Sequence, residues 1–237
     1  MLRELISIFR SSNPLREIGE NFAEMLGIAQ QLTLKAGDFF FEGSGSGDER
    51  AWIYEQDVKV NRLERQIRKQ VIAHLSISGN TLDLPYCLLI MNLVKDVERI
   101  GDYSKNLAEI IDFRPGPMPN DAIGVELREI RAGVEEEFQR TAQVFESSDQ
   151  AEALKLIRRG KDLNQQCKTL IGKIASSSHD APTVTALTLG TRYYKRVGGH
   201  VLNILSGVLM PLHKVDYYDE DAIPDALKAP SPSKESV

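Results

Sequence analysis

Cysteine is scarce in this sequence: only Cys87 and Cys167 occur among its 237 residues. The two lie far apart and match neither a zinc site nor a disulfide framework. This scarcity argues against a disulfide-stabilised secreted domain and predicts reduced thiols in a cytoplasmic protein.

Long apolar runs are also absent. The two most apolar stretches, residues 85–94 and 201–212, contain about 10–12 residues and are interrupted by Asn92, Asn203 and Ser206, whereas a membrane span needs about 20. The start of the chain lacks the apolar core and cleavage site of a signal peptide. We therefore expect neither a membrane span nor export.

The chain has no excess of positive charge. Asp and Glu number 34, Lys and Arg number 29, and the net charge is −5. Because this balance gives no overall attraction to nucleic acid, we expect no nucleic-acid partner.

Catalytic motifs are missing as well. The GSGSG segment at residues 43–47 has Gly where a nucleophile elbow needs Ser, and no P-loop, dinucleotide fingerprint or HExxH occurs. Di-iron enzymes use Glu-x-x-His pairs, and none follows Glu55, Glu98 or Glu109. The sequence favours binding over catalysis, that is, a protein that is not an enzyme.

Apolar residues recur at three- and four-residue intervals, and Gly-, Pro- and Ser-rich turns separate the periodic segments. This pattern predicts helices over residues 14–35, 49–75, 82–113, 121–145, 149–175 and 183–212. A break is possible in the last at Gly198–Gly199, and residues 39–48 are expected to form a flexible loop. No segment shows the alternation of a strand.

The halves of the chain match each other. Residues 97–107 parallel residues 194–204, so that Arg99 corresponds to Arg196 and Gly101 to Gly198. An internal duplication explains this match, and we predict an all-α fold of two tandem, pseudo-symmetric three-helix bundles. The bundles are expected at residues 13–114 and 121–214, with a Pro-rich joint at 115–120 that cannot be helical.

The two ends of the chain are expected to lie outside the bundles. Residues 1–12 predict a short amphipathic helix that packs on the body, with a docking or membrane-surface role as the alternative. Residues 215–237 are acidic and then rich in Pro and Ser, which is typical of a disordered tail.

Two carboxylates stand out in the third helical segment. Glu98 and Asp102 are four residues apart, so on a helix they lie within about 40° of each other. Like charges this close need compensation. Either a metal ion supplies it, or the neighbouring Lys95, Arg99 and Lys105 form salt bridges with them.

The segment DVERIGDYSKNLAEI at residues 96–110 resembles the signature of the PhoU family of phosphate-uptake regulators. Residues 54–61, YEQDVKVN, resemble a second segment of that family. The resemblance implies a dimeric, metal-binding adaptor that acts on a phosphate transporter subunit, on a phosphate-sensing histidine kinase, or on both. It would reach the membrane only through such a partner.

The resemblance also implies metal ligands. The family binds metal ions through D/E-x-x-x-D motifs, which this chain fills with Glu98 and Asp102 in one helix and with Asp57 and Asn61 in another. Glu55 is an additional candidate ligand. The implied ions are iron, zinc, magnesium or manganese, and the neutral Asn61 should weaken the site.

In the second half the matching positions no longer carry acids. Lys195 and Gly199 replace Glu98 and Asp102, while Arg158 and Gly160 replace Glu55 and Asp57. We therefore expect metal in the first half only. Lys195 and Arg158 are suited to an anion such as phosphate, or to a salt bridge with Asp162 or Glu152.

The leading functional hypothesis is a cytoplasmic regulator of phosphate uptake and phosphate signalling. A close variant is an accessory regulator of a sodium- or proton-coupled phosphate carrier. The alternatives from other classes are a carboxylate-bridged metal enzyme and a purely structural helical module.

Overall fold

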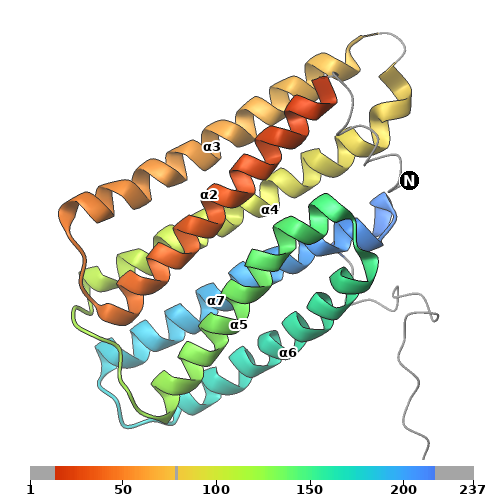
Figure 1. The fold of residues 1–237 in the computed structure, drawn as a ribbon. Helices are drawn as coiled ribbons and strands as arrows, with labels where there is room; N and C mark the ends of the chain where they lie inside the picture. The colour runs from red at the N-terminus through yellow and green to blue at the C-terminus, as the bar shows by residue number, and fades with distance from the viewer. Residues whose placement is uncertain (1–13, 78–79, 217–237) are drawn as a thin grey trace, which may run out of the picture.

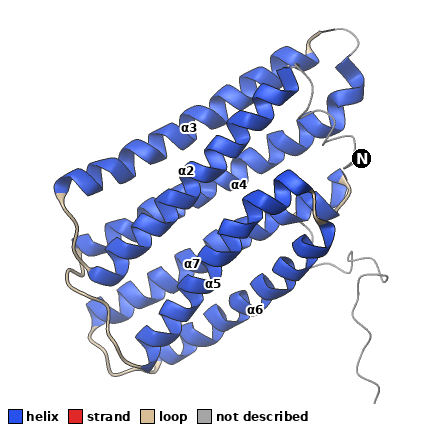
Figure 2. Ribbon diagram, viewed as in Figure 1, coloured by secondary structure: helices blue, strands red, loops and turns tan. Residues whose placement is uncertain are grey.

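The computed structural model describes residues 14–77 and 80–216, and helices and their connecting turns account for all of this part of the chain (Figure 2). The predicted all-α fold is confirmed. Six long helices follow one another, with bounds α2 Pro14–Glu42, α3 Gly47–Leu75, α4 Leu84–Ala108, α5 Ala122–Ser147, α6 Gln150–Ala175 and α7 Ala181–Leu209. Three short 3₁₀ helices lie at Asn80–Asp83, Glu109–Asp112 and Leu212–Lys214.

The predictions for residues 1–12 and for nearly all of the acidic tail fall outside the described residues. Within these, α2, α3 and α4 pack together, as do α5, α6 and α7, and the two sets lie side by side (Figure 1). The helices of both sets run along the same long direction. No helix in the described ranges is long and apolar enough to cross a membrane.

Side-chain caps fix where most of the long helices begin. Ser46 accepts from the backbone N–H of Glu49, whose carboxylate accepts from the N–H of Ser46, so the two form a capping box. Asp121, Asp149 and Asp180 cap α5, α6 and α7 in the same position. Helix α3 therefore begins two residues before the predicted start at residue 49, because Ser46 is its capping residue.

Helix α2 is longer than the sequence predicts, since it continues through the phenylalanines that we placed in a loop. Phe39, Phe40 and Phe41 are all buried. Gly190 of α7 makes room for one of them, because a Cβ added there would lie 2.3 Å from Cζ of Phe40. Burial against the second bundle therefore extends the helix to Glu42.

The loop between α2 and α3 pairs with the Pro-rich joint. The N–H of Gly116 donates to the carbonyl of Gly43 at 3.0 Å, and Met118 donates to Phe41 at the same distance. Gly43 has φ +60°, and a Cβ on it would lie 1.7 Å from the Gly116 carbonyl oxygen. Only glycine fits this position.

The two bundles share one hydrophobic core. Helices α4 and α7 run alongside each other through it, and Phe22 of α2 meets Phe145 of α5 with ring centroids 5.1 Å apart. Helix α7 is continuous through Gly198 and Gly199, so the expected break is absent. This arrangement places the acidic motif of α4 beside α3 on one side and α7 on the other.

Candidate functional site

Three of the predicted ligands form what we call the acidic row: Asp57 on α3, and Glu98 and Asp102 on α4. Their side chains are 9%, 13% and 29% exposed. The ammonium of Lys105 joins the two helices, because it lies 2.9 Å from Oδ2 of Asp57 and 3.8 Å from Oδ1 of Asp102. The fold therefore brings the carboxylates of α3 and α4 close to each other.

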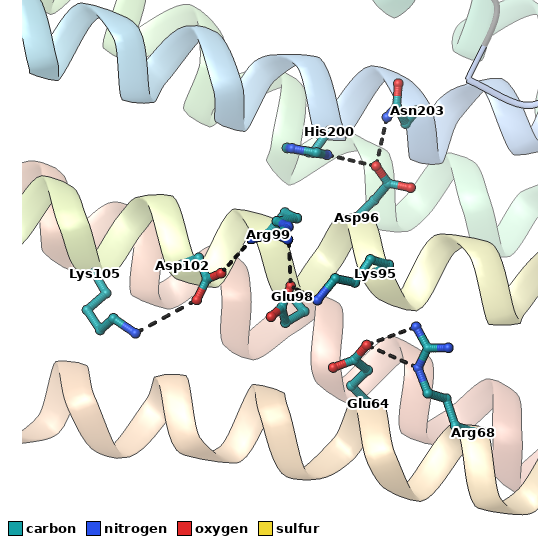
Figure 3. Close-up of polar contacts among 10 residues, drawn as sticks. All are labelled: Glu64, Arg68, Lys95, Asp96, Glu98, Arg99, Asp102, Lys105, His200 and Asn203. Carbon is teal, nitrogen blue, oxygen red and sulfur yellow. Dashed lines mark hydrogen bonds and ion pairs between the residues drawn. The ribbon is translucent and has the colours of Figure 1, made fainter.

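Two further cations, Lys95 and Arg99, form ion pairs with the carboxylates of α4 (Figure 3). Nζ of Lys95 lies 2.7 Å from Oε2 of Glu98, and Arg99 approaches both Glu98, at 3.8 Å, and Asp102, at 3.2 Å. Three carboxylates thus meet three cations, and the formal charge of the group is zero. The salt-bridge alternative recognised from the sequence is what the structure contains.

The remaining two predicted ligands stand apart from this group. Glu55 is exposed on α3, and Asn61 is half-buried one turn beyond Asp57. Among the described residues, neither has a hydrogen bond or ion pair to the acidic row. Glu64, the next acid of α3, pairs instead with Arg68 at 2.9 Å (Figure 3).

As the side chains stand, this donor set does not fit a metal ion. Within residues 14–77 and 80–216, no three His, Cys, Asp or Glu side chains gather closely enough to hold one. Burial acts to lower the pKa of Lys105, but its hydrogen bond to Asp57 and the charges of Asp57 and Asp102 outweigh it and raise the pKa. Lys105 stays charged, and metal binding here remains a prediction.

The equivalent place in the second bundle is basic. Lys195 and Gly199 lie on α7 where Glu98 and Asp102 lie on α4, and they border a pocket of about 310 Å³. The alternative salt bridge from Lys195 is absent in the described chain. Glu152 pairs with Arg140, and no ion pair links Lys195 to Asp162.

Sequence reasoning gave no role to Asp96, the first residue of the family signature. It is buried, and one carboxylate oxygen bonds both Nδ1 of His200, at 2.8 Å, and the Nδ2 amide of Asn203, at 2.7 Å (Figure 3). The contact joins α4 to α7.

A second buried acid also escaped the sequence analysis. Glu137 of α5 is fully buried, and neither carboxylate oxygen has a partner in the described chain. Burial raises its pKa to about 8. Nothing in the spacing of α5 signalled this, because Glu137 lies within a run of three glutamates, 135–137, that is typical of a solvated helix face.

Comparison with known proteins agrees with this architecture. A family model described as the PhoU domain matches residues 22–111, which span α2, α3 and α4. The phosphate-specific transport system accessory protein PhoU homolog of Synechocystis sp. (strain ATCC 27184 / PCC 6803 / Kazusa) is 39% identical over 59 residues, or 24% of this chain. The match spans about a quarter (26%) of the length of that curated relative.

Two solved structures share the fold across both bundles. PhoU from Pseudomonas aeruginosa matches with a TM-score of 0.74 and 21% identity, over 84% of this chain and 97% of that one. The phosphate transport system regulatory protein PhoU from Streptococcus pneumoniae matches with a TM-score of 0.66 and 16% identity, over 83% and 95%. The resemblance to the PhoU family is confirmed: a PhoU domain matches residues 22–111, and both bundles share the fold of solved PhoU structures.

Proposed function

We propose that this chain regulates phosphate uptake and phosphate signalling as an adaptor. The observation that carries the proposal is the fold match to a PhoU structure over 97% of that structure, combined with a PhoU domain in the first bundle. The related proteins are described as accessory and regulatory proteins of phosphate transport. The proposed partners are a phosphate transporter subunit, a phosphate-sensing histidine kinase, or both.

One feature favours a second candidate, an accessory regulator of a sodium- or proton-coupled phosphate carrier. The second bundle carries Lys195 and Gly199 where the family motif has acids, so the chain departs from the symmetric family pattern. A different transporter class is a natural reason for such a departure. The genes that neighbour this one separate the two candidates cheaply.

The function is tested by deleting the gene in its own host and restoring it on a plasmid. We expect the deletion to change the initial rate of radiolabelled phosphate uptake, or the expression of phosphate-responsive genes in phosphate-rich medium, and the restored gene to reverse the change. Unchanged uptake and unchanged expression would reject both candidates.

Metal binding and self-association belong to the same proposal. An ion at the acidic row must displace Lys105 and Arg99 from the carboxylates, so we expect weak binding of iron, zinc, magnesium or manganese there. Dimerisation is the family expectation. Light scattering of the purified chain at micromolar concentration measures it, and a monomer would count against it.

A further inference from the structure

Three cations on one face of α7 have no acidic partner in the described chain: Arg192, Lys195 and Arg196. Their spacing of three and four residues places them together. Other arginines of the second bundle do have partners. Arg131 pairs with Asp38 and Glu135, and Arg159 pairs with Glu136. On α3, Arg62, Arg65 and Lys69 also lack an acidic partner in the described chain, so the protein has two basic clusters of this kind.

These cations border a pocket between α6 and α7 that we call the basic pocket. Its volume is about 310 Å³, and its lining residues are Asn164, Arg192, Lys195, Arg196, Gly199, His200 and Asn203. Gly199 leaves it open, since a Cβ added there would meet no atom within 4 Å. The lining contains amide, imidazole and cationic donors but no carboxylate.

In the protein without a ligand, these neighbouring cations repel one another. Burial lowers the pKa of Lys195, and the charges of Lys168, Arg192 and Arg196 lower it further. Asp96 of α4 lies next to the pocket, where two lining residues, His200 and Asn203, bond its carboxylate. A bound anion would relieve this repulsion, because opposite charges favour the ionised form of Lys195.

The basic pocket is the counterpart of the acidic row. Lys195 corresponds to Glu98, Gly199 to Asp102, and Asn164 to Asn61 by the internal match of the halves. The sign of the charge is reversed between two equivalent places of the same fold. A pocket lined by cations where the first bundle has carboxylates favours an anionic ligand over a metal ion.

We propose that the basic pocket binds the phosphoryl group of a small molecule. Guanidinium groups donate in a fork that matches two phosphate oxygens, and lysine adds a point charge. The volume lies at the lower end of the range for small-molecule sites. The group is supplied either by orthophosphate itself or by a larger molecule with a pyrophosphate unit. The inference stands independently of the proposed regulatory role.

The test is calorimetric titration of the purified full chain, in a buffer without phosphate, with orthophosphate and with pyrophosphate. The double variant Lys195→Ala/Arg196→Ala removes two charges from the pocket. Arg62→Ala/Arg65→Ala is the matched control, because it removes two arginines that also lack an acidic partner in the described chain and that border a separate basic pocket of about 720 Å³ on α3. We expect one saturable site in the wild type and the control, and at least tenfold weaker binding in the pocket variant.

Thermal melting without ligand keeps the result interpretable. The pocket variant should melt no lower than the wild type, because it loses mutually repelling charges rather than a salt bridge. Tighter binding of pyrophosphate identifies the larger molecule as the source, and equal or tighter binding of orthophosphate identifies the free ion. Absence of saturable binding for both anions, or an equal loss in the control, overturns the proposal and leaves the deletion experiment unaffected.

Discussion

At the scale of single residues, each bundle has a buried acid, but the two acids lie on helices that do not correspond: α3 in the first bundle and α5 in the second. Asp57 of α3 and Glu137 of α5 are both buried acids. Gly160 occupies the place of Asp57, and a Cβ there would lie 2.4 Å from Oε1 of Glu137. The space left by the lost aspartate is filled by the new glutamate.

Glu137 makes the stability of the second bundle depend on pH. Its pKa rises from 4.5 to about 8 on burial, so the folded state holds its proton more tightly than the unfolded state. The associated stability is fully present below about pH 4.5 and is lost as the pH rises towards 8. We expect the free energy of unfolding of the wild type to fall relative to Glu137→Met by about 3 kcal/mol across this window.

Urea unfolding at a series of pH values measures this difference. Glu137→Gln is the control, because it retains a buried polar group but cannot titrate, so its difference from Glu137→Met should stay constant with pH. A wild-type curve parallel to that of Glu137→Met between pH 5 and 8 would show that Glu137 has an ordinary pKa.

At the scale of helices, α4 and α7 meet through a pseudo-twofold contact. Asp96 of α4 bonds His200 of α7, and the matching positions, Tyr193 of α7 and Tyr103 of α4, face each other with ring centroids 6.1 Å apart. Tyr103 also stacks on His200, with centroids 5.8 Å apart. Each position thus contacts the counterpart of the other, as in an isologous dimer interface.

Removing Asp96 tests how much this contact holds the bundles together. In Asp96→Ala, Asn203 and His200 lose their shared acceptor in a buried place, so we expect a loss of roughly 1–3 kcal/mol in the free energy of unfolding. Asp102→Ala removes the same charge from a more exposed position of the same helix and should cost less than about 1 kcal/mol. Equal losses in chemical denaturation would assign Asp96 no special role between the bundles.

The helices were largely predictable because their apolar stripes and caps are local signals. The long end of α2 was not, since Phe40 and Phe41 pack against residues of the second bundle, and those contacts are remote in sequence. The carboxylates of the acidic row lie on helices, as the apolar pattern predicts, but their ion pairs depend on how far side chains reach across helices. Asp96 and Glu137 were missed for the same reason: their surroundings come from α6 and α7.

At the scale of the whole molecule, the duplication has produced two bundles with one fold and opposite local chemistry. The first encloses three carboxylates that its own cations neutralise, and the second exposes cations that no described acid neutralises. The proposed regulator would have two unlike candidate sites, one in each bundle. The fold supplies the frame, while a few substitutions at matching positions decide which charge each bundle receives.

The last prediction concerns competition at the acidic row. If Lys105 occupies the place of an ion, removing it should free Asp57 and Asp102, and metal affinity should rise. We expect Lys105→Ala to bind manganese or zinc at least tenfold more tightly than the wild type in calorimetric titration. The metal-dependent rise in melting temperature should increase as well, because an ion that binds only the folded state stabilises it by mass action.

Two further variants serve as controls for this prediction. Glu98→Ala/Asp102→Ala should bind neither ion. Lys59→Ala should behave as the wild type, because Lys59 of α3 pairs with no acid in the described chain. Equal affinities for Lys105→Ala and the wild type would mean that the lysine does not compete, and metal bound by the double variant would place the ion away from the acidic row.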